Sequence, residues 1–87
     1  MTKYNSEFSK EFKKDLKKIR SNFDLQEKLE DKMEAILEDP HHYKTLRNIL
    51  KNKRRAHLGS FVLIFRIIEE EKMVIFESLK HHDEAYE

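Results

Sequence analysis

Arginine and histidine side chains cluster in two short segments of the second half of the chain. The segments RRAH and HHDEAY contribute Arg54, Arg55, His57, His81, His82 and Tyr86. Arginine binds phosphate through a planar fork of donors, and an unperturbed imidazole, with a pKa near ~6.5, exchanges protons at neutral pH. Cleavage of RNA by its own 2′-hydroxyl needs a base, an acid and positive charge around the phosphate. The two segments are therefore candidates for a phosphodiester site.

Metal and cofactor chemistry has little support in the sequence. Adjacent histidines occur at 41–42 and 81–82, but neighbours on a strand point to opposite faces, and the chain has no cysteine. A single glycine, Gly59, excludes the glycine-rich loops that cradle phosphates, and no nucleophile elbow is present. We expect no metal and no cofactor.

Positive charge is concentrated in the middle of the chain. Residues 40–68 hold seven Lys or Arg, three His and no acid, whereas residues 69–87 hold two Lys and seven acids. The net charge of +1 hides this separation. A basic block of this kind is typical of a protein that binds a polyanion, and it is equally compatible with a solvated face that acidic neighbours balance.

The size and composition of the chain indicate one small domain. With 87 residues, of which 38% are hydrophobic, we expect a single domain over 1–87. The longest apolar run, residues 61–65, is too short to cross a bilayer, and the first residues lack the apolar region of a signal peptide. We expect no membrane association, and the lack of cysteine makes a cytoplasmic location the default.

Two helices are predicted in the first half. Apolar residues spaced by four, four and three predict a helix over about 6–21, with Ser6 as its cap. Asp24, followed three residues later by Glu27, predicts the start of a second helix, which Pro40 ends. The stretch 41–53 has no clear period and predicts a basic connection, in which Leu46–Leu50 suit one helical turn.

The second half predicts three consecutive strands. The period changes to two over about 54–58, 61–68 and 73–79, where β-branched and aromatic residues are frequent. Gly59-Ser60 suits a two-residue hairpin loop, and Tyr4 with its neighbours suits a short edge strand. The order predicts an α+β fold, in which an antiparallel helical hairpin packs on a small, mainly antiparallel sheet.

A two-residue loop also determines which side chains share a face, because cross-strand partners point the same way. One face is apolar and is expected to pack against the helices; it holds Ala56, Leu58, Phe61, Leu63, Phe65 and Ile67. No predicted helix covers the other face, which holds Arg55, His57, Val62, Ile64 and Arg66. We therefore expect Val62, Ile64 and Ile68 to be exposed and to contact a protein partner.

Five motifs follow one another in a familiar order. They are FSKEFKKDLKKI, a second helix ended by a proline, LRNILKNKRR, the Gly-x-aromatic hairpin GSF with an apolar strand that contains Phe65, and HHDEAYE. In this order the chain resembles the RelE/ParE superfamily of toxins from type II toxin–antitoxin systems, most closely the RelE-type mRNA interferases. The resemblance implies a curved sheet, cleavage of mRNA in the ribosomal A site without a metal, and a RelB-like antitoxin that wraps and silences the toxin.

The resemblance also implies site residues. Catalytic roles are expected for Arg55, His57, His82 and Tyr86, and antitoxin contacts for Val62, Ile64 and Ile68. RNA contacts are expected for Lys44, Arg47, Lys51, Lys53, Arg54, Arg66 and His81. Arg54 and Arg55 are adjacent on a strand, so only one of them can face the RNA, and we favour Arg55. Val62 and His82 stand where active members usually carry arginine.

Two alternatives to the nuclease remain open at this point. One is a non-enzymatic, ParE-like toxin that binds a protein target such as DNA gyrase, and the other is a member that binds only its antitoxin. The missing arginines at 62 and 82 favour these alternatives. The basic block favours the nuclease, with basic residues meeting RNA and the apolar strand beside them meeting an antitoxin segment that folds on binding.

Overall fold

The computed structural model describes residues 3–45 and 53–85, which form a mixed four-stranded sheet and its helices. The elements in chain order are β1 (Asn5–Phe8), α1 (Lys10–Lys18), α2 (Phe23–Glu38), the 3-10 turn η1 (Pro40–His42), β2 (Lys53–Leu58), β3 (Phe61–Ile68), the 3-10 turn η3 (Glu69–Glu71), β4 (Met73–His81) and α3 (His82–Ala85). The strand order is β1-β4-β3-β2, with only the β1–β4 pair parallel. The predicted α+β fold is confirmed.

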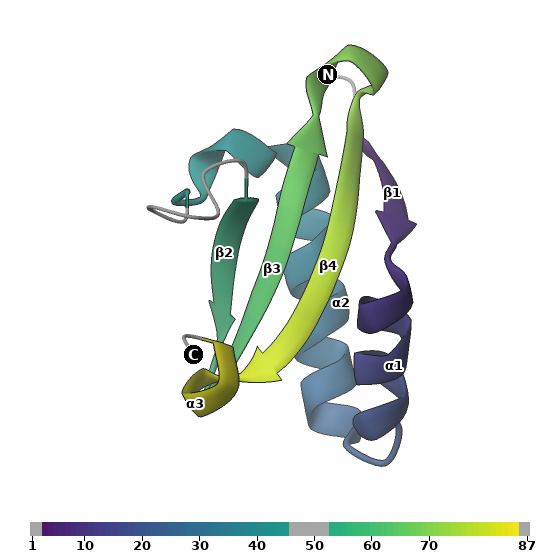
Figure 1. The fold of residues 1–87 in the computed structure, drawn as a ribbon, viewed down its shortest axis with the longest axis vertical. Coiled ribbons are helices and arrows are strands. Elements are labelled where there is room, and N and C mark those ends of the chain that lie inside the picture. The colour runs from purple at the N-terminus through teal and green to yellow at the C-terminus, as the bar shows by residue number, and fades with distance from the viewer. Residues whose placement is uncertain (1–2, 46–52, 86–87) are drawn as a thin grey trace.

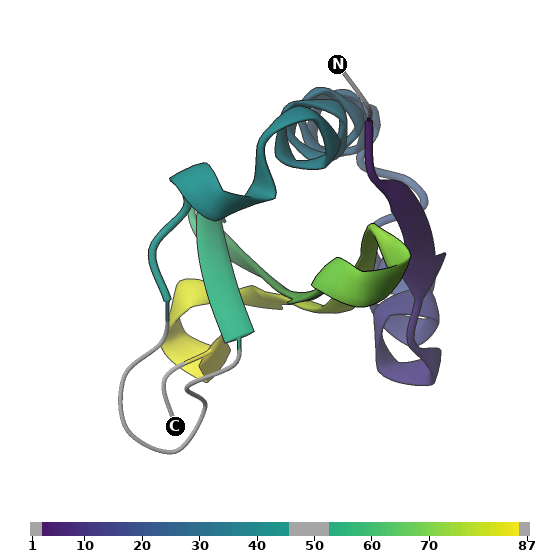
Figure 2. The same cartoon turned by 90° about the horizontal axis from the view of Figure 1, so that it is seen from above.

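The helices occupy different positions around the sheet. Figure 1 shows α1 below β1 and beside β4, and α2 running antiparallel to α1 behind the strands. The view from above in Figure 2 shows α3 on the side of the sheet away from α2. One face of the sheet therefore packs on α2, and the other is covered only at one end by α3 among the described residues.

The first helix is shorter than predicted, and the prediction that Ser6 caps it is wrong. Residues 5–8 pair in parallel with β4, so they are extended rather than helical. The cap is Ser9, whose Oγ accepts a hydrogen bond from the Phe12 N–H at 3.0 Å and donates one to the Glu77 carbonyl at 2.7 Å. Ser9 thus joins the start of α1 to β4. The predicted edge strand near Tyr4 is confirmed.

The second helix begins one residue earlier than its predicted cap. Asn22 is the cap, since its Oδ1 accepts from the Leu25 N–H at 3.2 Å, and Asp24 lies inside the first turn. An acid in the first turn still interacts favourably with the helix dipole. The helix ends at Glu38, two residues before Pro40, as predicted.

The register of β2 and β3 is the one predicted from the two-residue loop. Leu58 pairs with Phe61, His57 with Val62 and Arg55 with Ile64. Gly59 has a φ of +56°, a left-handed conformation that glycine adopts without strain. Alternate residues of the hairpin therefore point to opposite faces, as expected from the sequence.

A bulge interrupts the pairing of β3 with β4. Ile64 pairs with Ser78, but the next residue, Phe65, pairs with Phe76, so Glu77 has no partner in β3. Such an extra residue bends a strand and increases its twist. The bulge lies beside Arg66, in the middle of the sheet face that points away from α2.

The core lies between α1, α2 and the sheet. Phe12, Phe65 and Phe76 are fully buried, and the Phe12 and Phe76 rings stack with centroids 5.7 Å apart. The predicted apolar face of the hairpin packs here, with Phe61 and Ile67 half-buried at its margin. Phe8 is 39% exposed because it lies on the edge strand β1.

The connection after α2 begins with η1 and approaches β2 at Lys44 and Thr45. Thr45 forms an antiparallel bridge with Arg54, and the Lys44 carbonyl accepts the Arg55 N–H at 3.1 Å. The predicted helical turn at Leu46–Leu50 lies outside the described residues. Among the residues described, no helix is long and apolar enough to cross a membrane.

Candidate functional site

The sheet face that points away from α2 carries three cross-strand rows of side chains, and we call it the basic face. The first row is His57, Val62 and Lys80, the second is Arg55, Ile64 and Ser78, and the third is Lys53, Arg66 and Ile75. Each row brings together residues far apart in sequence, because β2, β3 and β4 pair in register. Four Lys or Arg and one His lie on this face.

Val62 and Ile64 are buried, so the expectation that they form an exposed apolar patch is wrong. Val62 is 1% exposed and Ile64 is 8% exposed. Their cross-strand neighbours are mostly long polar side chains that flank them, and α3 packs against β3 and β4 at the hairpin end. Ile68 is half-buried, and its contact with an antitoxin stays a prediction.

Glu77, the bulged residue of β4, binds two cations of the basic face. Its Oε2 accepts from Arg66 Nε at 2.7 Å, and its Oε1 lies 3.6 Å from Lys53 Nζ. The Glu77 side chain is only 19% exposed, so solvent screens these interactions incompletely. Lys53 and Arg66, both predicted to contact RNA, are therefore partly neutralised within the protein.

Lys80 stands between the basic face and α1. Its Nζ lies 2.9 Å from Asp15 Oδ1 and 3.2 Å from Glu11 Oε2. Asp15 is 2% exposed, and its other oxygen accepts the backbone N–H of Leu79 at 2.8 Å. The hydrogen bond to Asp15 is the main cause that raises the pKa of Lys80 above its ordinary value. Lys80 therefore keeps its charge over the whole neutral range.

The C-terminal histidines lie at the hairpin end of the sheet. The His82 N–H donates to the Ser60 carbonyl at 2.6 Å, which fixes the start of α3 against the β2–β3 loop. His81 packs edge-to-face on Phe61, with ring centroids 5.6 Å apart. His57 belongs to the row nearest this loop, so the fold brings His57 and the start of α3 to one end of the sheet, whereas His81 pairs with Phe61 and so points to the opposite face from His57.

Asp83 lies between the two C-terminal imidazoles. Its carboxylate oxygens are each 3.7 Å from a histidine Nδ1, one from His81 and one from His82. The Asp83 N–H also donates to His81 Nδ1 at 3.3 Å. These contacts restrict the orientation of the two imidazoles, which can hold or move protons at neutral pH.

Arg54 faces the other side of the sheet. It pairs with Phe65, a core residue, and its Nη1 donates to the Tyr43 carbonyl at 2.7 Å. The sequence prediction that only one of Arg54 and Arg55 faces the RNA side agrees with this register, which puts Arg55 on the basic face. The RNA contacts assigned to Arg54 and to the exposed Lys44 stay predictions. Arg47, Lys51 and Tyr86 lie outside the described residues.

Comparison with known proteins identifies the family. A family model described as "ParE toxin of type II toxin-antitoxin system, parDE" matches residues 7–86. The chain belongs to this toxin family. Nearly the whole fold, from the end of β1 onward, lies within the match, so both the basic face and α3 are parts of a toxin domain.

One related sequence and one solved structure bear RelE names, and a further solved structure shares the fold. This toxin is 50% identical over 56 residues to the "Putative toxin RelE4" of Methanocaldococcus jannaschii, a match that covers 63% of the toxin but only 60% of that relative's length. The toxin–antitoxin complex RelBE2 from Mycobacterium tuberculosis is 25% identical, with a TM-score of 0.80 over 92% of this chain and 99% of that one. YafQ from E. coli is 23% identical, with a TM-score of 0.77 over 97% and 99% of the two chains.

Sequence reasoning missed two site residues of the toxin, Glu77 and Lys80. Lys80 follows the predicted end of the last strand by one residue, and extending that strand would have placed it beside Val62. The bulge at Glu77 breaks the alternation of side chains along β4, and no sequence pattern predicts a bulge at that position. Glu77 pairs with Lys53 and Arg66, and Lys80 pairs with Asp15 and Glu11. These ion pairs determine how much positive charge the basic face presents.

Proposed function

We propose that this toxin is an endoribonuclease that cleaves mRNA positioned on the ribosome, and that a cognate antitoxin neutralises it. The basic face carries the proposal. It combines the cations Lys53, Arg55, Arg66 and Lys80 with His57, and it ends beside α3, which begins at His82. Such a face supplies a phosphate clamp next to groups that exchange protons.

The chemistry assigned to this face is an attack by the RNA's own 2′-hydroxyl. One imidazole, from His57 or His82, accepts the 2′-hydroxyl proton while O2′ bonds to the adjacent phosphorus. The bond from phosphorus to O5′ breaks, and a second proton donor protonates O5′. Arg55, in the row beside His57, stabilises the charge on the phosphorane-like transition state. The products are a 2′,3′-cyclic phosphate and a 5′-hydroxyl.

The ribosome has a defined part in this proposal. The site relies on cations and proton donors, so most of its rate enhancement must come from alignment of O2′, phosphorus and O5′. Glu77 and Asp15 already occupy several of the cations, which leaves loosely bound RNA few contacts. mRNA held by the ribosome is presented in a fixed geometry, and we expect it to be the productive substrate.

We propose an antitoxin because this chain is similar to a toxin whose structure was solved in complex with one. The M. tuberculosis structure is a toxin–antitoxin complex, RelBE2. A RelB-like segment that covers the basic face would block RNA, and its acids would meet the cations there. Ile68 and the half-buried margin of the sheet provide apolar contact for such a segment.

A cell-free translation reaction tests the proposal. Purified toxin is added to a reaction that translates one defined mRNA, and the length of that mRNA is followed on a gel alongside protein synthesis. The proposal predicts loss of full-length mRNA together with loss of synthesis. Inhibited synthesis with intact mRNA, or no inhibition by a folded toxin, would reject it.

A second candidate function is inhibition of a protein target such as DNA gyrase. The matched family is described by the name ParE, and Val62 is a buried aliphatic residue at a position where active RelE-type members usually carry arginine. A DNA supercoiling assay with gyrase separates the candidates. Inhibition of supercoiling by the toxin, with mRNA left intact in the translation reaction, would favour this second function.

A further inference from the structure

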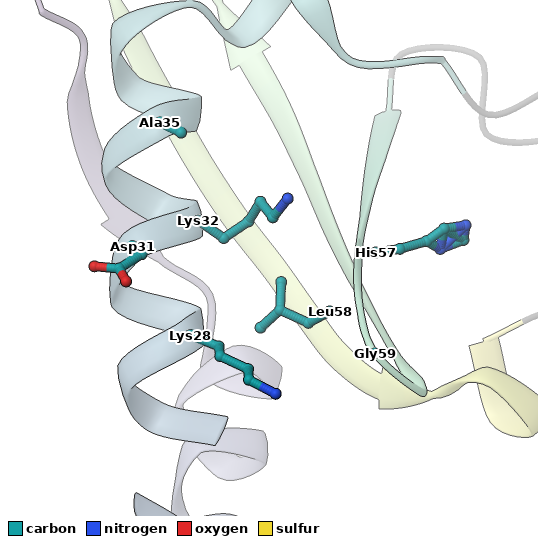
Figure 3. A pocket seen from close by; sticks show the side chains of 7 residues that line it. All are labelled: Lys28, Asp31, Lys32, Ala35, His57, Leu58 and Gly59. Atoms are coloured by element: carbon teal, nitrogen blue, oxygen red, sulfur yellow. The ribbon is translucent and has the colours of Figure 1, made fainter. Parts of the chain in front are cut away.

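A groove separates α2 from the edge strand β2, on the side of the sheet opposite to the basic face. Its volume is about 360 Å³, and it is lined by Lys28, Asp31, Lys32, Ala35, His57, Leu58 and Gly59. Figure 3 shows Lys28 and Lys32 extending from α2 toward β2, whereas Asp31 points away from the strand. The groove is therefore basic at its mouth and apolar at Leu58, which is buried.

Charge is divided between the two sides of α2. Three acids of this helix, Glu30, Asp31 and Glu34, line a second groove beside β1, together with Phe8 and Met33. The lysines at 28 and 32 face the opposite way, toward β2. Within residues 3–45 and 53–85, neither lysine forms an ion pair, whereas Lys3 pairs with Glu34 on the acidic side.

Two like charges four residues apart weaken a helix. Lys28 and Lys32 are neighbours on the helix surface, and such a pair destabilises a helix by roughly 0.2–0.5 kcal/mol. Within the described residues no acid of β2 offsets them, since β2 reads KRRAHL. An anionic ligand in the groove would turn this repulsion into attraction.

His57 connects the groove with the basic face at the edge of β2, since its side chain points away from α2 in Figure 3. His57 lines the groove, and its row on the sheet also contains Val62 and Lys80. Arg55 directs its backbone N–H outward, to the Lys44 carbonyl, so the alternation of antiparallel pairing turns the backbone of His57 outward as well. A ligand that crosses this edge meets a backbone donor and the imidazole before it reaches Arg55.

We propose that the groove binds the sugar–phosphate backbone of the RNA strand whose scissile phosphate lies on the basic face, with Lys28 and Lys32 contacting phosphates beyond the cleaved bond. This inference rests on the proposed function and extends it by a second contact surface. A continuous polyanion fits the observations better than an isolated anion, because the positive charge runs from Lys28 and Lys32 past His57 to Arg55 and Lys53. The toxin would then hold RNA on both sides of strand β2.

RNA binding as a function of salt concentration tests the proposal. The full-length Lys28→Ala, Lys32→Ala toxin is compared with the wild type by fluorescence anisotropy, using single-stranded RNAs of about three and about twelve nucleotides, lengths that bracket a small binding site. A 2′-O-methyl group on each nucleotide prevents cleavage, because it removes the attacking hydroxyl proton and keeps the ribose backbone. The matched control is Lys13→Ala, Lys17→Ala, a pair with the same spacing on exposed positions of α1, beyond the other edge of the sheet.

We expect affinity to fall only for the groove variant and only for the longer RNA. The double variant should bind the longer RNA about tenfold more weakly, and the slope of log K against log salt should fall by about 1.4, or 0.7 for each lost phosphate contact. Binding of the short RNA should not change. The α1 control should lose little affinity for either RNA, and circular dichroism should give the same helix content for all three proteins.

Three outcomes would overturn the proposal. Equal losses in the groove and control variants would mean that only net charge matters, and an unchanged slope would mean that the lysines contact no phosphate. If the Lys28→Ala, Lys32→Ala variant lost binding to a poly-glutamate peptide but bound RNA like the wild type, the groove would be assigned to an acidic protein segment. Full-length mRNA that stays intact in the cell-free translation reaction would instead reject the proposed function itself, so the two failures are distinguishable.

Discussion

Arg66 of β3 donates a hydrogen bond from Nε to Oε2 of Glu77, 2.7 Å away at the bulge of β4. Glu77 also lies 3.6 Å from Lys53, so one carboxylate restrains two cations of the basic face. The Glu77→Gln variant should therefore bind single-stranded RNA more tightly, with a salt slope steeper by about 0.7 for each cation that gains a phosphate contact. Anisotropy titrations at several salt concentrations measure this.

A charge-matched variant separates the local effect of Glu77 from net charge. Glu70 lies on the exposed turn between β3 and β4, so Glu70→Gln removes the same charge away from the basic face. It should change the affinity for RNA much less than Glu77→Gln does. Equal gains in the two variants would show that Glu77 does not restrain Arg66 and Lys53.

Asp15 is the buried acid that ties α1 to β4. Replacement by alanine leaves the Leu79 N–H without its acceptor and removes the main partner of Lys80, which should cost about 3 kcal/mol in the free energy of unfolding. Asp15→Asn keeps an acceptor for Leu79 and should cost less. Urea denaturation measures both values.

Glu11 provides the comparison for Asp15. It also pairs with Lys80, at 3.2 Å, but its side chain is 59% exposed, so Glu11→Ala should cost under about 1 kcal/mol. A loss for Asp15→Ala as small as that for Glu11→Ala would contradict the structural role given to the buried carboxylate.

Glu69 makes the stability of the fold depend on pH in the acid range. Hydrogen bonds from Lys72 first, and then from His41 and Tyr4, lower the pKa of Glu69 to about 2. A carboxyl whose pKa is lower in the folded state stabilises that state above its ordinary pKa, here 4.5, and the contribution disappears as the pH falls toward 2. Glu69 should therefore stabilise the toxin at pH 6 and hardly at pH 2.

Comparison with Glu69→Gln isolates this contribution. The thermal midpoint of the wild type should exceed that of the variant at pH 6, and the difference should shrink between pH 4.5 and pH 2. Differential scanning calorimetry over this range measures it. A difference that stays constant with pH would show that the carboxylate contributes nothing through its ionisation.

Gly59 closes the hairpin that also anchors α3. Its φ of +56° is unfavourable for other residues, although no atom lies within 4 Å of an added Cβ. Gly59→Ala should therefore lower the free energy of unfolding by about 1 kcal/mol through backbone strain alone. Gly59→Asn should cost less, since asparagine tolerates this conformation. Equal costs for the two variants, measured in urea, would contradict this explanation.

The sequence predicted the β2–β3 hairpin well because the residues that determine its pairing are close together in the sequence. A two-residue loop with one glycine determines the register, and alternation then assigns each side chain to a face. The start of the first helix was predicted wrongly for the opposite reason. Phe8 and Phe12 are four residues apart, which suits a helix, but residues 5–8 are extended because β4, about seventy positions later, offers them a parallel partner.

Burial on the basic face could not be predicted from the same pattern. Val62 and Ile64 alternate with core residues, so the sequence indicated correctly that they point away from α2. Their coverage depends on how His57, Lys80 and Arg55 lie over the sheet and on where α3 folds back, which are tertiary contacts without a local signal. The same limitation hid the pairing of Glu77 with Arg66.

Primer extension at nucleotide resolution tests the central proposal most directly. A defined mRNA is incubated in a reconstituted translation reaction with wild-type toxin or with Arg55→Ala, His57→Ala, in the presence and absence of ribosomes. The proposed function predicts discrete cuts only with wild-type toxin and ribosomes, each leaving a 2′,3′-cyclic phosphate. Identical cuts by the double variant, or no cuts by a folded wild-type toxin, would contradict it.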